Sequence, residues 1–249
     1  MLWAIGDIHG YSLSLRRLLD RIAPEPEDTV VTLGDYIDRG PDTRGVLERL
    51  IQLQKECHYV PLRGNHEAML LAIWLRHQVL GKKRPFSFRK FLRRQWTYWT
   101  VGKYRAETIR FPEWVLLGGR QTLASYGPNV WQIEQIPTDH LEFLQQTRLY
   151  YETPDAIFTH AAYLPELPME EQPAEALLFH RLRESIPAPH FSGKKVYVGH
   201  SAQRQGEILD VGHLMCIDTF LYGGGWLTAI EVTSGQILQI DAGGRMRGG

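Results

Sequence analysis

Three polar turns, each placed directly after an apolar run, are the feature that most constrains this chain. They read GDIHG at residues 6–10, GDYIDRG at residues 34–40 and RGNHE at residues 63–67. Asp35 follows Asp7 by 28 positions, and Asn65 follows Asp35 by 30. Each interval is about the length of one βαβ unit. Three parallel strands should therefore deliver the three turns to one edge of a single sheet.

The segments between the turns support this interpretation. The apolar runs at residues 2–5, 29–33 and 58–62 are typical of buried parallel strands. Apolar residues then recur at helical spacing, namely Leu15, Leu18, Leu19 and Ile22 after the first turn and Val46, Leu47, Leu50 and Ile51 after the second. The first 75 residues are therefore predicted to repeat strand, polar turn and helix.

The side chains of the turns are those that bind metals and phosphate. The set comprises Asp7, His9, Asp35, Asp38, Arg39, Asn65 and His66. Carboxylates crowded in one crevice raise one another's pKa values, and divalent cations remove that conflict. Imidazole and oxygen donors without thiolate suit Mn, Fe or Zn, and we expect two such ions, with Mn favoured. Ions about 3.5–4 Å apart, bridged by Asp35, would supply a hydroxide for in-line attack on phosphorus.

The three turns resemble the signature blocks of the phosphoprotein phosphatase branch of the calcineurin-like metallophosphoesterases. The family also needs two later histidines at strand ends, and the apolar runs at residues 156–160 and 196–200 each end in one. The resemblance covers most of the chain. It implies an α/β fold, a four-layer α/β/β/α sandwich with two mixed sheets. It also implies one domain, residues 1–249, with a basic, mainly helical insert at about residues 76–116.

Carried over by position, the resemblance assigns the metal ligands. Asp7 and His9 would hold the first ion and Asp35 would bridge the two. The second ion would be held by Asn65, His160 and His200.

The resemblance also assigns the residues that act on the substrate. His66 would be the general acid that protonates the leaving oxygen, and Asp38 would orient it and keep it protonated. Arg39 would clamp the phosphoryl oxygens. Further substrate contacts are expected from Asn65, Arg181 and Tyr222, with Arg183 as an alternative to Arg181. Arg63 is expected either to contact the substrate or only to brace the carboxylates.

The implied reaction is hydrolysis of a phosphomonoester by a serine/threonine protein phosphatase-like enzyme, acting on phosphoserine or phosphothreonine and also considered for phosphotyrosine. Two motifs depart from the family pattern: His160 is followed by Ala161-Ala162 instead of Ala-Gly, and His200 by Ser201-Ala202 instead of Thr-Pro. Neither departure removes a ligand. Ala202 replaces the second histidine of the phosphodiesterase block Gly-His-x-His, which favours the phosphatase branch.

Two other functions stay open at this point. A symmetrical dinucleoside-tetraphosphate hydrolase has nearly the same fold and ligands, but that group tends to lack the residue matching Asp38 and to end its third block in Asp instead of Glu67. A non-catalytic binding module on the same fold typically loses ligands, whereas all six ligand positions are present here.

The middle of the chain is strongly basic. Between Arg76 and Arg110 there are 11 Lys and Arg residues and a single acid, Glu107. This segment could attract anionic substrates, with residues 82–84 as the test positions, but a solvated helical face is the favoured interpretation. The neighbouring residues 118–127 also resemble bacterial members of the family and are given no chemical role.

Composition limits the partners. Lys+Arg and Asp+Glu both number 28, so the overall charge gives no reason to expect a nucleic-acid partner, although it leaves local basic patches open. The resemblance implies instead a phosphoprotein or a small phosphorylated molecule as the substrate. The longest apolar run, residues 68–75, is too short to cross a bilayer, and the chain begins without a signal-like stretch. We therefore expect a cytoplasmic protein without membrane contact, and leave its oligomeric state open. Residues 214–217, 226–232 and 236–240 are predicted to form antiparallel strands.

Overall fold

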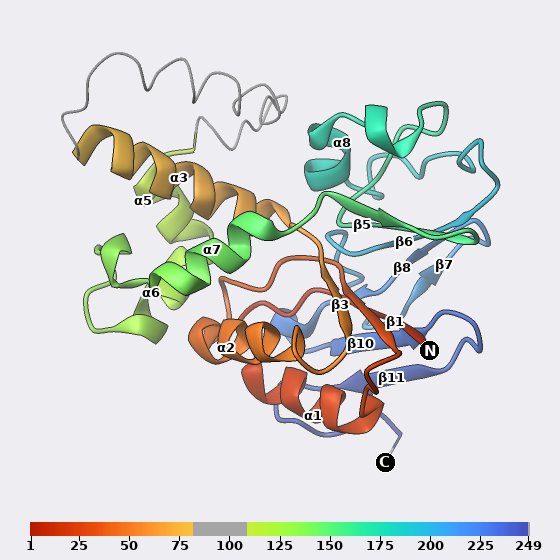
Figure 1. Ribbon diagram of the computed structural model, residues 1–249, viewed down its shortest axis with the longest axis horizontal. Helices are drawn as coiled ribbons and strands as arrows, with labels where there is room; N and C mark the ends of the chain where they lie inside the picture. The colour runs from red at the N-terminus through yellow and green to blue at the C-terminus, as the bar shows by residue number, and fades with distance from the viewer. Residues whose placement is uncertain (82–108, 249) are drawn as a thin grey trace.

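The computed structural model describes residues 1–81 and 109–248 (Figure 1). The strands are β1 Leu2–Ile5, β2 Thr29–Thr32, β3 His58–Pro61, β4 Tyr150–Glu152, β5 Ala156–Thr159, β6 Lys195–Val198, β7 Leu209–Asp210, β8 Leu214–Cys216, β9 Asp218–Thr219, β10 Trp226–Glu231 and β11 Ile237–Ile240. The helices are α1 Ser12–Ile22, α2 Thr43–Leu53, α3 Asn65–Gly81, α5 Phe111–Trp114, α6 Arg120–Tyr126, α7 Thr138–Gln146 and α8 Ala174–Phe179, with short helical turns at η1 Val115–Gly119, η2 Ile133–Gln135, η3 Met169–Glu171 and η4 Leu221–Gly223. Most of the predicted basic insert, including residues 82–84, lies outside the described residues.

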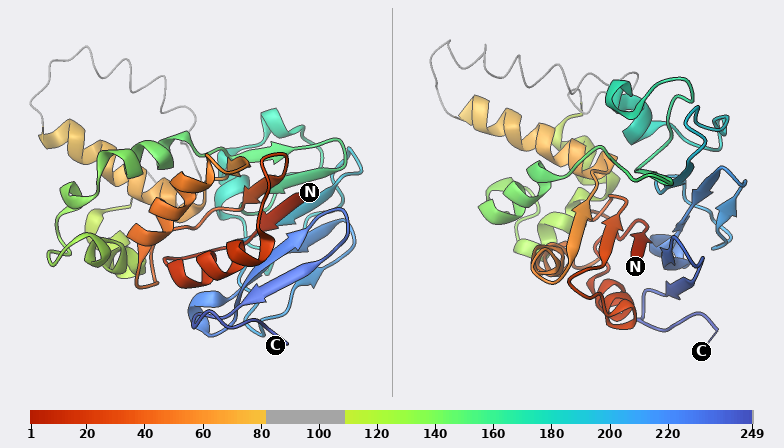
Figure 2. Two further views of the ribbon diagram at one scale, coloured as in Figure 1. Left: turned by 60° about the horizontal axis from the view of Figure 1, so that its bottom comes forward. Right: turned by 45° about the vertical axis from the view of Figure 1, so that its right-hand side comes forward.

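The first sheet contains the predicted βαβ repeat. Strands β1, β2 and β3 are parallel neighbours, with Ala4 opposite Val31 and Val31 opposite Val60. The last part of the chain adds β10 and β11 antiparallel on the other side of β1, and β9 pairs with β10. Helix α1 therefore lies beside β11, although they come from opposite ends of the described chain (Figure 2).

The second sheet is also mixed, in the order β4-β5-β6-β8-β7. Its central strands β5, β6 and β8 are parallel, and the edge strands β4 and β7 are antiparallel to their neighbours. The prediction of an antiparallel strand at residues 214–217 is only partly correct, because β8 pairs antiparallel with β7 but in parallel with β6. An apolar run predicts a strand but not its direction. The predicted pairing of the two final strands is correct.

The two sheets pack face to face and helices cover their outer faces, so the predicted four-layer α/β/β/α sandwich is confirmed (Figures 1 and 2). The alternation along each strand explains the layers. Ala156 and Phe158 point between the sheets with Val31 and Val60, whereas Ile157 faces the layer that contains α8. On the far side of the first sheet, α1, α2, α3 and α7 bury a larger core.

Two local features position the functional turns. Helix α2 is capped by Asp42, whose side chain accepts a hydrogen bond from the Gly45 amide at 2.9 Å. Helix α3 begins at Asn65, so the polar residues of the third turn lie in its first helical turn. Among the described helices, none combines the length and the apolar character that a membrane crossing requires.

Candidate dimetal site

The predicted site residues gather where the parallel strands of both sheets end. The turns after β1, β2 and β3 carry the residues of the three motifs, and His160 and His200 follow β5 and β6. The third central strand of the second sheet, β8, is followed by Asp218, which sequence reasoning did not select. The sequence does contain a pattern that points to Asp218, because this aspartate directly follows the apolar run at residues 214–217.

The backbone at this edge is strained. Among the described residues, seven that are not glycine have a positive φ, and five of them are His9, Asp35, Asp38, Arg39 and His200. Such conformations cost about 1–3 kcal/mol each and persist only where the surrounding structure enforces them. Their concentration among the predicted site residues is typical of a functional site.

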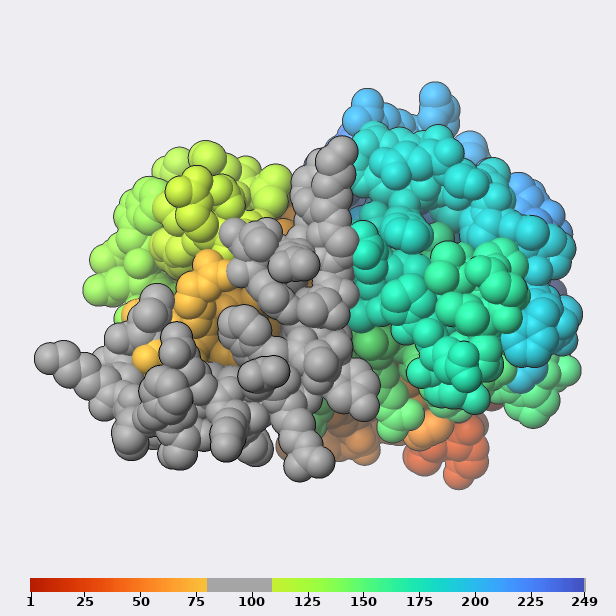
Figure 3. Space-filling model, turned by 90° about the horizontal axis from the view of Figure 1, so that it is seen from above, coloured from red at the N-terminus to blue at the C-terminus, as the bar shows by residue number. Residues whose placement is uncertain are grey.

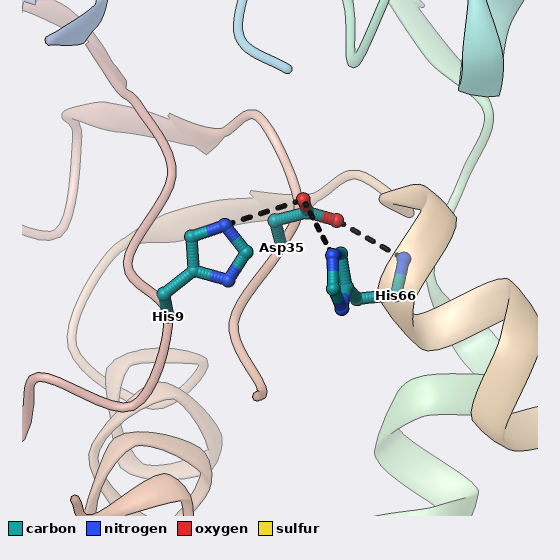
Figure 4. Close-up of side chains that lie close together, drawn as sticks. All are labelled: His9, Asp35 and His66. Atoms are coloured by element: carbon teal, nitrogen blue, oxygen red, sulfur yellow. Dashed lines mark hydrogen bonds and ion pairs between the residues drawn. The ribbon is translucent and has the colours of Figure 1, made fainter. Parts of the chain in front are cut away.

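Asp35 lies at the centre of the cluster (Figure 4). Its Oδ2 atom is 3.5 Å from His9 Nε2 and 3.9 Å from His66 Nε2, and its Oδ1 atom is 3.5 Å from His160 Nε2. Burial alone would raise the pKa of Asp35, but the surrounding imidazoles, His160 first, lower it below its ordinary value. Asp35 is therefore an ionised carboxylate. One of its oxygens faces His9, in the half of the site expected to hold the first ion, and the other faces His160, in the half expected to hold the second.

The three histidines assigned to metals each have one ring nitrogen fixed by a backbone carbonyl. Nδ1 of His9 donates to Ile37 O at 2.9 Å and Nδ1 of His160 donates to Leu33 O at 2.8 Å. Nε2 of His200 lies 3.3 Å from Phe179 O. Because a carbonyl oxygen can only accept, the remaining nitrogen of each ring presents a lone pair to the site, the arrangement found in metal-binding histidines.

In the second half of the site, lone pairs face one another. Asn65 Oδ1 lies 3.1 Å from His160 Nε2 and 2.9 Å from His200 Nδ1, and the opposite nitrogen of each ring carries the proton. Burial lowers the pKa of His160, and burial with the nearby His160 lowers that of His200 to about 3. Neutral acceptors this close repel one another unless a cation lies between them. This donor set therefore fits a divalent metal.

In the first half of the site, two buried carboxylates lie close together. Both oxygens of Asp7 accept from the His200 backbone amide at 3.1 Å. Burial and the negative charges of Asp218 and Asp35 raise the pKa of Asp7 well above its ordinary value, and burial raises that of Asp218 to about 6. A divalent ion bound by Asp7, His9 and Asp35 would remove this repulsion. The residues present therefore fit the expected pair of metals.

Arg39 reaches into this crevice from the turn after β2. Its guanidinium donates to His9 Nε2 at 2.8 Å and to His66 Nε2 at 3.1 Å, and its Cζ lies 4.0 Å from the ring centre of Tyr222. The Tyr222 ring also contacts the His9 ring edge-on at 5.0 Å. Tyr222 therefore forms a wall of the crevice, and a metal on His9 Nε2 requires the guanidinium to turn away from that nitrogen.

His66 forms a buried pair with Asp38. Its Nδ1 lies 2.6 Å from Asp38 Oδ2, and both side chains are almost fully enclosed. Burial lowers the pKa of His66, but the charge of Asp35 and the hydrogen bond to Asp38 outweigh it and raise the pKa above its ordinary value. His66 also lies close to His9 and Asp35, within a group that could hold a metal, but its bond to Asp38 favours the acid role.

Two of the arginines expected at the substrate have different surroundings. The Arg63 guanidinium contacts the C-terminal end of α7, where it donates to Thr147 Oγ1 at 2.9 Å and to the carbonyl of Gln145 at 2.9 Å. These bonds join α7 to the third turn, and a contact of Arg63 with substrate stays a prediction. Arg181 is exposed, and its charge contributes to lowering the pKa of His200. Arg183 is also exposed.

Comparison with known proteins identifies the family. The sequence profile described as calcineurin-like phosphoesterase matches residues 1–212. The chain belongs to this family. The family predicted from the motifs, and with it the metallophosphoesterase class of enzyme, is therefore confirmed. Members of the family use a dimetal centre, in agreement with the His and Asp groups found here.

Individual relatives of this calcineurin-like phosphoesterase carry two kinds of name. Over 70 residues it is 43% identical to serine/threonine-protein phosphatase 1 of Salmonella typhimurium, a match that spans 28% of this chain and 31% of that phosphatase. Over 193 residues it is 28% identical to the symmetrical bis(5'-nucleosyl)-tetraphosphatase of Acidovorax sp. strain JS42, which covers 62% of this chain and 67% of the relative.

Among solved structures, the fold is similar to that of a protein provisionally described as a diadenosine tetraphosphatase. The TM-score is 0.61 and the identity 21%, over 96% of this chain and 92% of the other. At this level of identity the similarity concerns the fold alone.

Proposed function

We propose that this chain is a metal-dependent phosphomonoester hydrolase and that its substrates are phosphoproteins carrying phosphoserine or phosphothreonine, with phosphotyrosine as a further substrate. The observation that carries the proposal is the buried hydrogen bond of 2.6 Å between Asp38 and His66. The protein would hold two divalent ions, with Mn as the favoured metal. Their ligands would be Asp7, His9, Asp35, Asn65, His160 and His200. When bound, such ions supply an activated water and offset the charge of the phosphoryl group.

Side chains of the protein would bind the phosphoryl group and protonate the leaving oxygen. Arg39 turns from the two imidazoles to the phosphoryl oxygens, where its planar fork makes charge-assisted hydrogen bonds. This movement frees His66 Nε2 to carry a proton, while Nδ1 stays bound to Asp38. His66 then protonates the oxygen that leaves. Tyr222, stacked on Arg39 at 4.0 Å, limits the directions in which the guanidinium can turn.

The leaving group decides between the two kinds of relative. A serine or threonine side chain leaves as an alkoxide, a very poor leaving group that needs a proton in the transition state. A nucleoside diphosphate leaves through a phosphate oxygen whose pKa is only about 6, so it can depart without an acid. Burying charged groups is costly unless they are paired and hydrogen-bonded; the Asp38–His66 bond meets this requirement and leaves His66 Nε2 for the acid role once Arg39 turns away. The Asp38–His66 pair therefore favours the phosphomonoester reaction.

A second candidate is symmetrical hydrolysis of dinucleoside tetraphosphates. It is favoured by the named relative in Acidovorax and by a pocket close to Arg181. This pocket has a volume of about 390 Å³ and lies in the part of the surface that is teal in Figure 3. It is lined by Ala162, Tyr163, Leu164, Pro165, His180, Arg181, Glu184, Ser185, Ile186, Pro187 and Ala188. Its volume is in the range of small-molecule sites, and a base or a peptide side chain could enter it.

The test compares three substrates under one set of conditions. Mn-loaded enzyme and a chelated control are given a phosphoserine peptide, a phosphotyrosine peptide and diadenosine tetraphosphate, and both phosphate and nucleoside diphosphate are measured. We expect the peptides to be turned over fastest and the chelated control to be inactive. Faster release of ADP from the dinucleotide would replace the proposal with the second candidate. No turnover of any substrate would favour a non-catalytic binding module.

A further inference from the structure

The Asp38 carboxylate is held by two donors besides His66, one from the end of the predicted basic insert and one from α6. Trp114 Nε1 donates to Oδ2 at 2.8 Å, and Thr122 Oγ1 donates to Oδ1 at 2.6 Å. The Asp38 backbone amide in turn donates to Thr122 Oγ1 at 2.9 Å. Asp38, Trp114 and Thr122 all have 0% of their surface exposed.

The hydrogen bonds around Thr122 have a fixed direction. A threonine hydroxyl has one proton, and Thr122 gives it to the carboxylate because the carboxylate can only accept. Thr43 Oγ1, at the start of α2, lies 3.1 Å from Thr122 Oγ1 and must therefore be the donor in that bond. Donors thus converge on Asp38 from α5, α6 and α3, and no polar atom of the carboxylate is exposed to water.

Two glycines allow close packing here: Gly118 against the turn that carries Asp38 and Arg39, and Gly119 against the Trp114 ring. Gly118 has a φ of 125°, and a Cβ there would lie 2.8 Å from the backbone nitrogen of Arg39. The Gly118 carbonyl accepts from that same nitrogen at 3.2 Å. A Cβ on Gly119 would lie 2.4 Å from the Trp114 ring. The close approach keeps Asp38 and Arg39 in their left-handed conformations, with φ of 71° and 69°.

We propose that Trp114 and Thr122 are positioning residues for the general acid, an inference that rests on the proposed function. The carboxylate torsion of an aspartate is broad and roughly two-fold, so a carboxylate with one partner can rotate. A separate donor on each oxygen stops that rotation and aims one lone pair of Oδ2 at His66 Nδ1. The imidazole then keeps the orientation that presents Nε2 to the leaving oxygen.

The leaving group provides the test, because only a poor leaving group needs the acid. Thr122→Val, Thr122→Ser and Trp114→Phe are compared on phenyl phosphate and 2,4-dinitrophenyl phosphate with Mn-loaded enzyme. We expect Thr122→Val and Trp114→Phe to lower kcat for phenyl phosphate by about 10- to 100-fold, a partial loss that reaches the lower end of the roughly 100- to 10,000-fold that general acids contribute. In these two variants kcat for 2,4-dinitrophenyl phosphate should change by no more than about threefold, and KM for both substrates should stay unchanged. Thr122→Ser should turn over phenyl phosphate as fast as the original protein does.

The controls separate positioning from folding. Ser125→Ala removes a different hydroxyl of α6, one that donates to Thr122 O at 2.7 Å, and should leave both rates unchanged. His66→Asn must itself show the selective loss on phenyl phosphate. If it does not, the acid assignment in the proposed function fails. The positioning proposal alone is overturned if His66→Asn lowers kcat only for phenyl phosphate, whereas Thr122→Val lowers kcat equally for both esters or for neither.

A second measurement does not depend on turnover. In the metal-free protein, the Nδ1 proton of His66 in its short bond to Asp38 should give a downfield proton NMR signal. We expect this signal in the original protein and in Thr122→Ser, and expect it to broaden or shift upfield in Thr122→Val. An unchanged signal in Thr122→Val would show that the hydroxyl does not control the pair and would overturn the proposal.

Discussion

Arg39 shows how much of the site depends on the shape of one side chain. Its guanidinium spans His9 and His66 with two parallel donors and rests on the Tyr222 ring. A lysine keeps the charge but has neither the planar fork nor the stacking surface. A charge-assisted hydrogen bond contributes about 1.5–3 kcal/mol, so the loss of one such bond in the transition state is a large effect.

We therefore predict that Arg39→Lys lowers kcat/KM for a phosphomonoester about 10- to 100-fold, since each 1.36 kcal/mol is a tenfold change. The measurement is steady-state kinetics on a phosphoserine peptide. Arg44→Lys is the matched control, because Arg44 is exposed and pairs with Glu48 within α2. Equal rates for Arg39→Lys and the original protein would remove Arg39 from the phosphoryl-binding role.

At the scale of elements, Glu67 joins the first turn of α3 to the turn after β2. Its carboxylate accepts from the backbone amides of Asp35, Tyr36 and Gly64, each at 2.8 Å, and from that of Ile37 at 3.3 Å. These donors are buried, so a side chain with fewer acceptor sites leaves some of them unpaired. Glu67 thereby fixes the path of the turn that carries Asp35 and Asp38.

We predict that Glu67→Gln destabilises the metal-free protein by about 2–4 kcal/mol, because each buried unpaired donor costs about 1–3 kcal/mol. Urea denaturation of chelated protein measures the change. Glu142→Gln on the exposed face of α7 should shift stability by no more than about 0.5 kcal/mol. A Glu67→Gln variant as stable as the original would mean that water or a shifted backbone replaces the missing acceptor.

The elements also explain which features the sequence could predict. The spacing of the three turns predicts parallel strands and therefore places Asp7, Asp35 and Asn65 at one sheet edge. The donors to Asp38 could not be found in this way. Trp114 and Thr122 lie 76 and 84 positions away from it, outside any βαβ repeat or helical period. Such contacts depend on the packing of whole elements, which no local pattern encodes.

At the scale of the whole molecule, the metal site joins the two sheets, so metal binding should be coupled to folding. Residues from the turns of the first sheet and from β5 and β6 of the second sheet would contact the same pair of ions. Without metal, the buried carboxylate of Asp7, after β1, is close enough to that of Asp218, at the start of β9, for its pKa to be raised. A ligand that binds only the folded state stabilises that state.

The pH dependence of this coupling follows from the carboxylates. The pKa of Asp218 is raised from 3.8 to about 6 in the folded protein. Between these values the folded protein holds more protons on Asp218 than the unfolded chain does, so the contribution of Asp218 to stability falls as the pH rises through this window. The buried His200, whose pKa is lowered to about 3, contributes in the opposite direction. Divalent ions bind the deprotonated ligands, so their affinity rises with pH. Manganese should therefore stabilise the folded protein more at neutral than at acidic pH.

We predict that Mn²⁺ raises the melting temperature more at about pH 7.5 than at about pH 5, because Asp7 and Asp218, whose pKa values are raised, are more fully deprotonated at the higher pH. Thermal unfolding of chelated protein, with and without added Mn²⁺, measures both shifts. Asp218→Asn removes one titrating group and its repulsion of Asp7. It should therefore stabilise the metal-free protein more at neutral pH than at about pH 4, because the Asp218 contribution to the pH dependence is lost. A manganese shift of equal size at both pH values would mean that Asp7 and Asp218 are not linked to the bound ions.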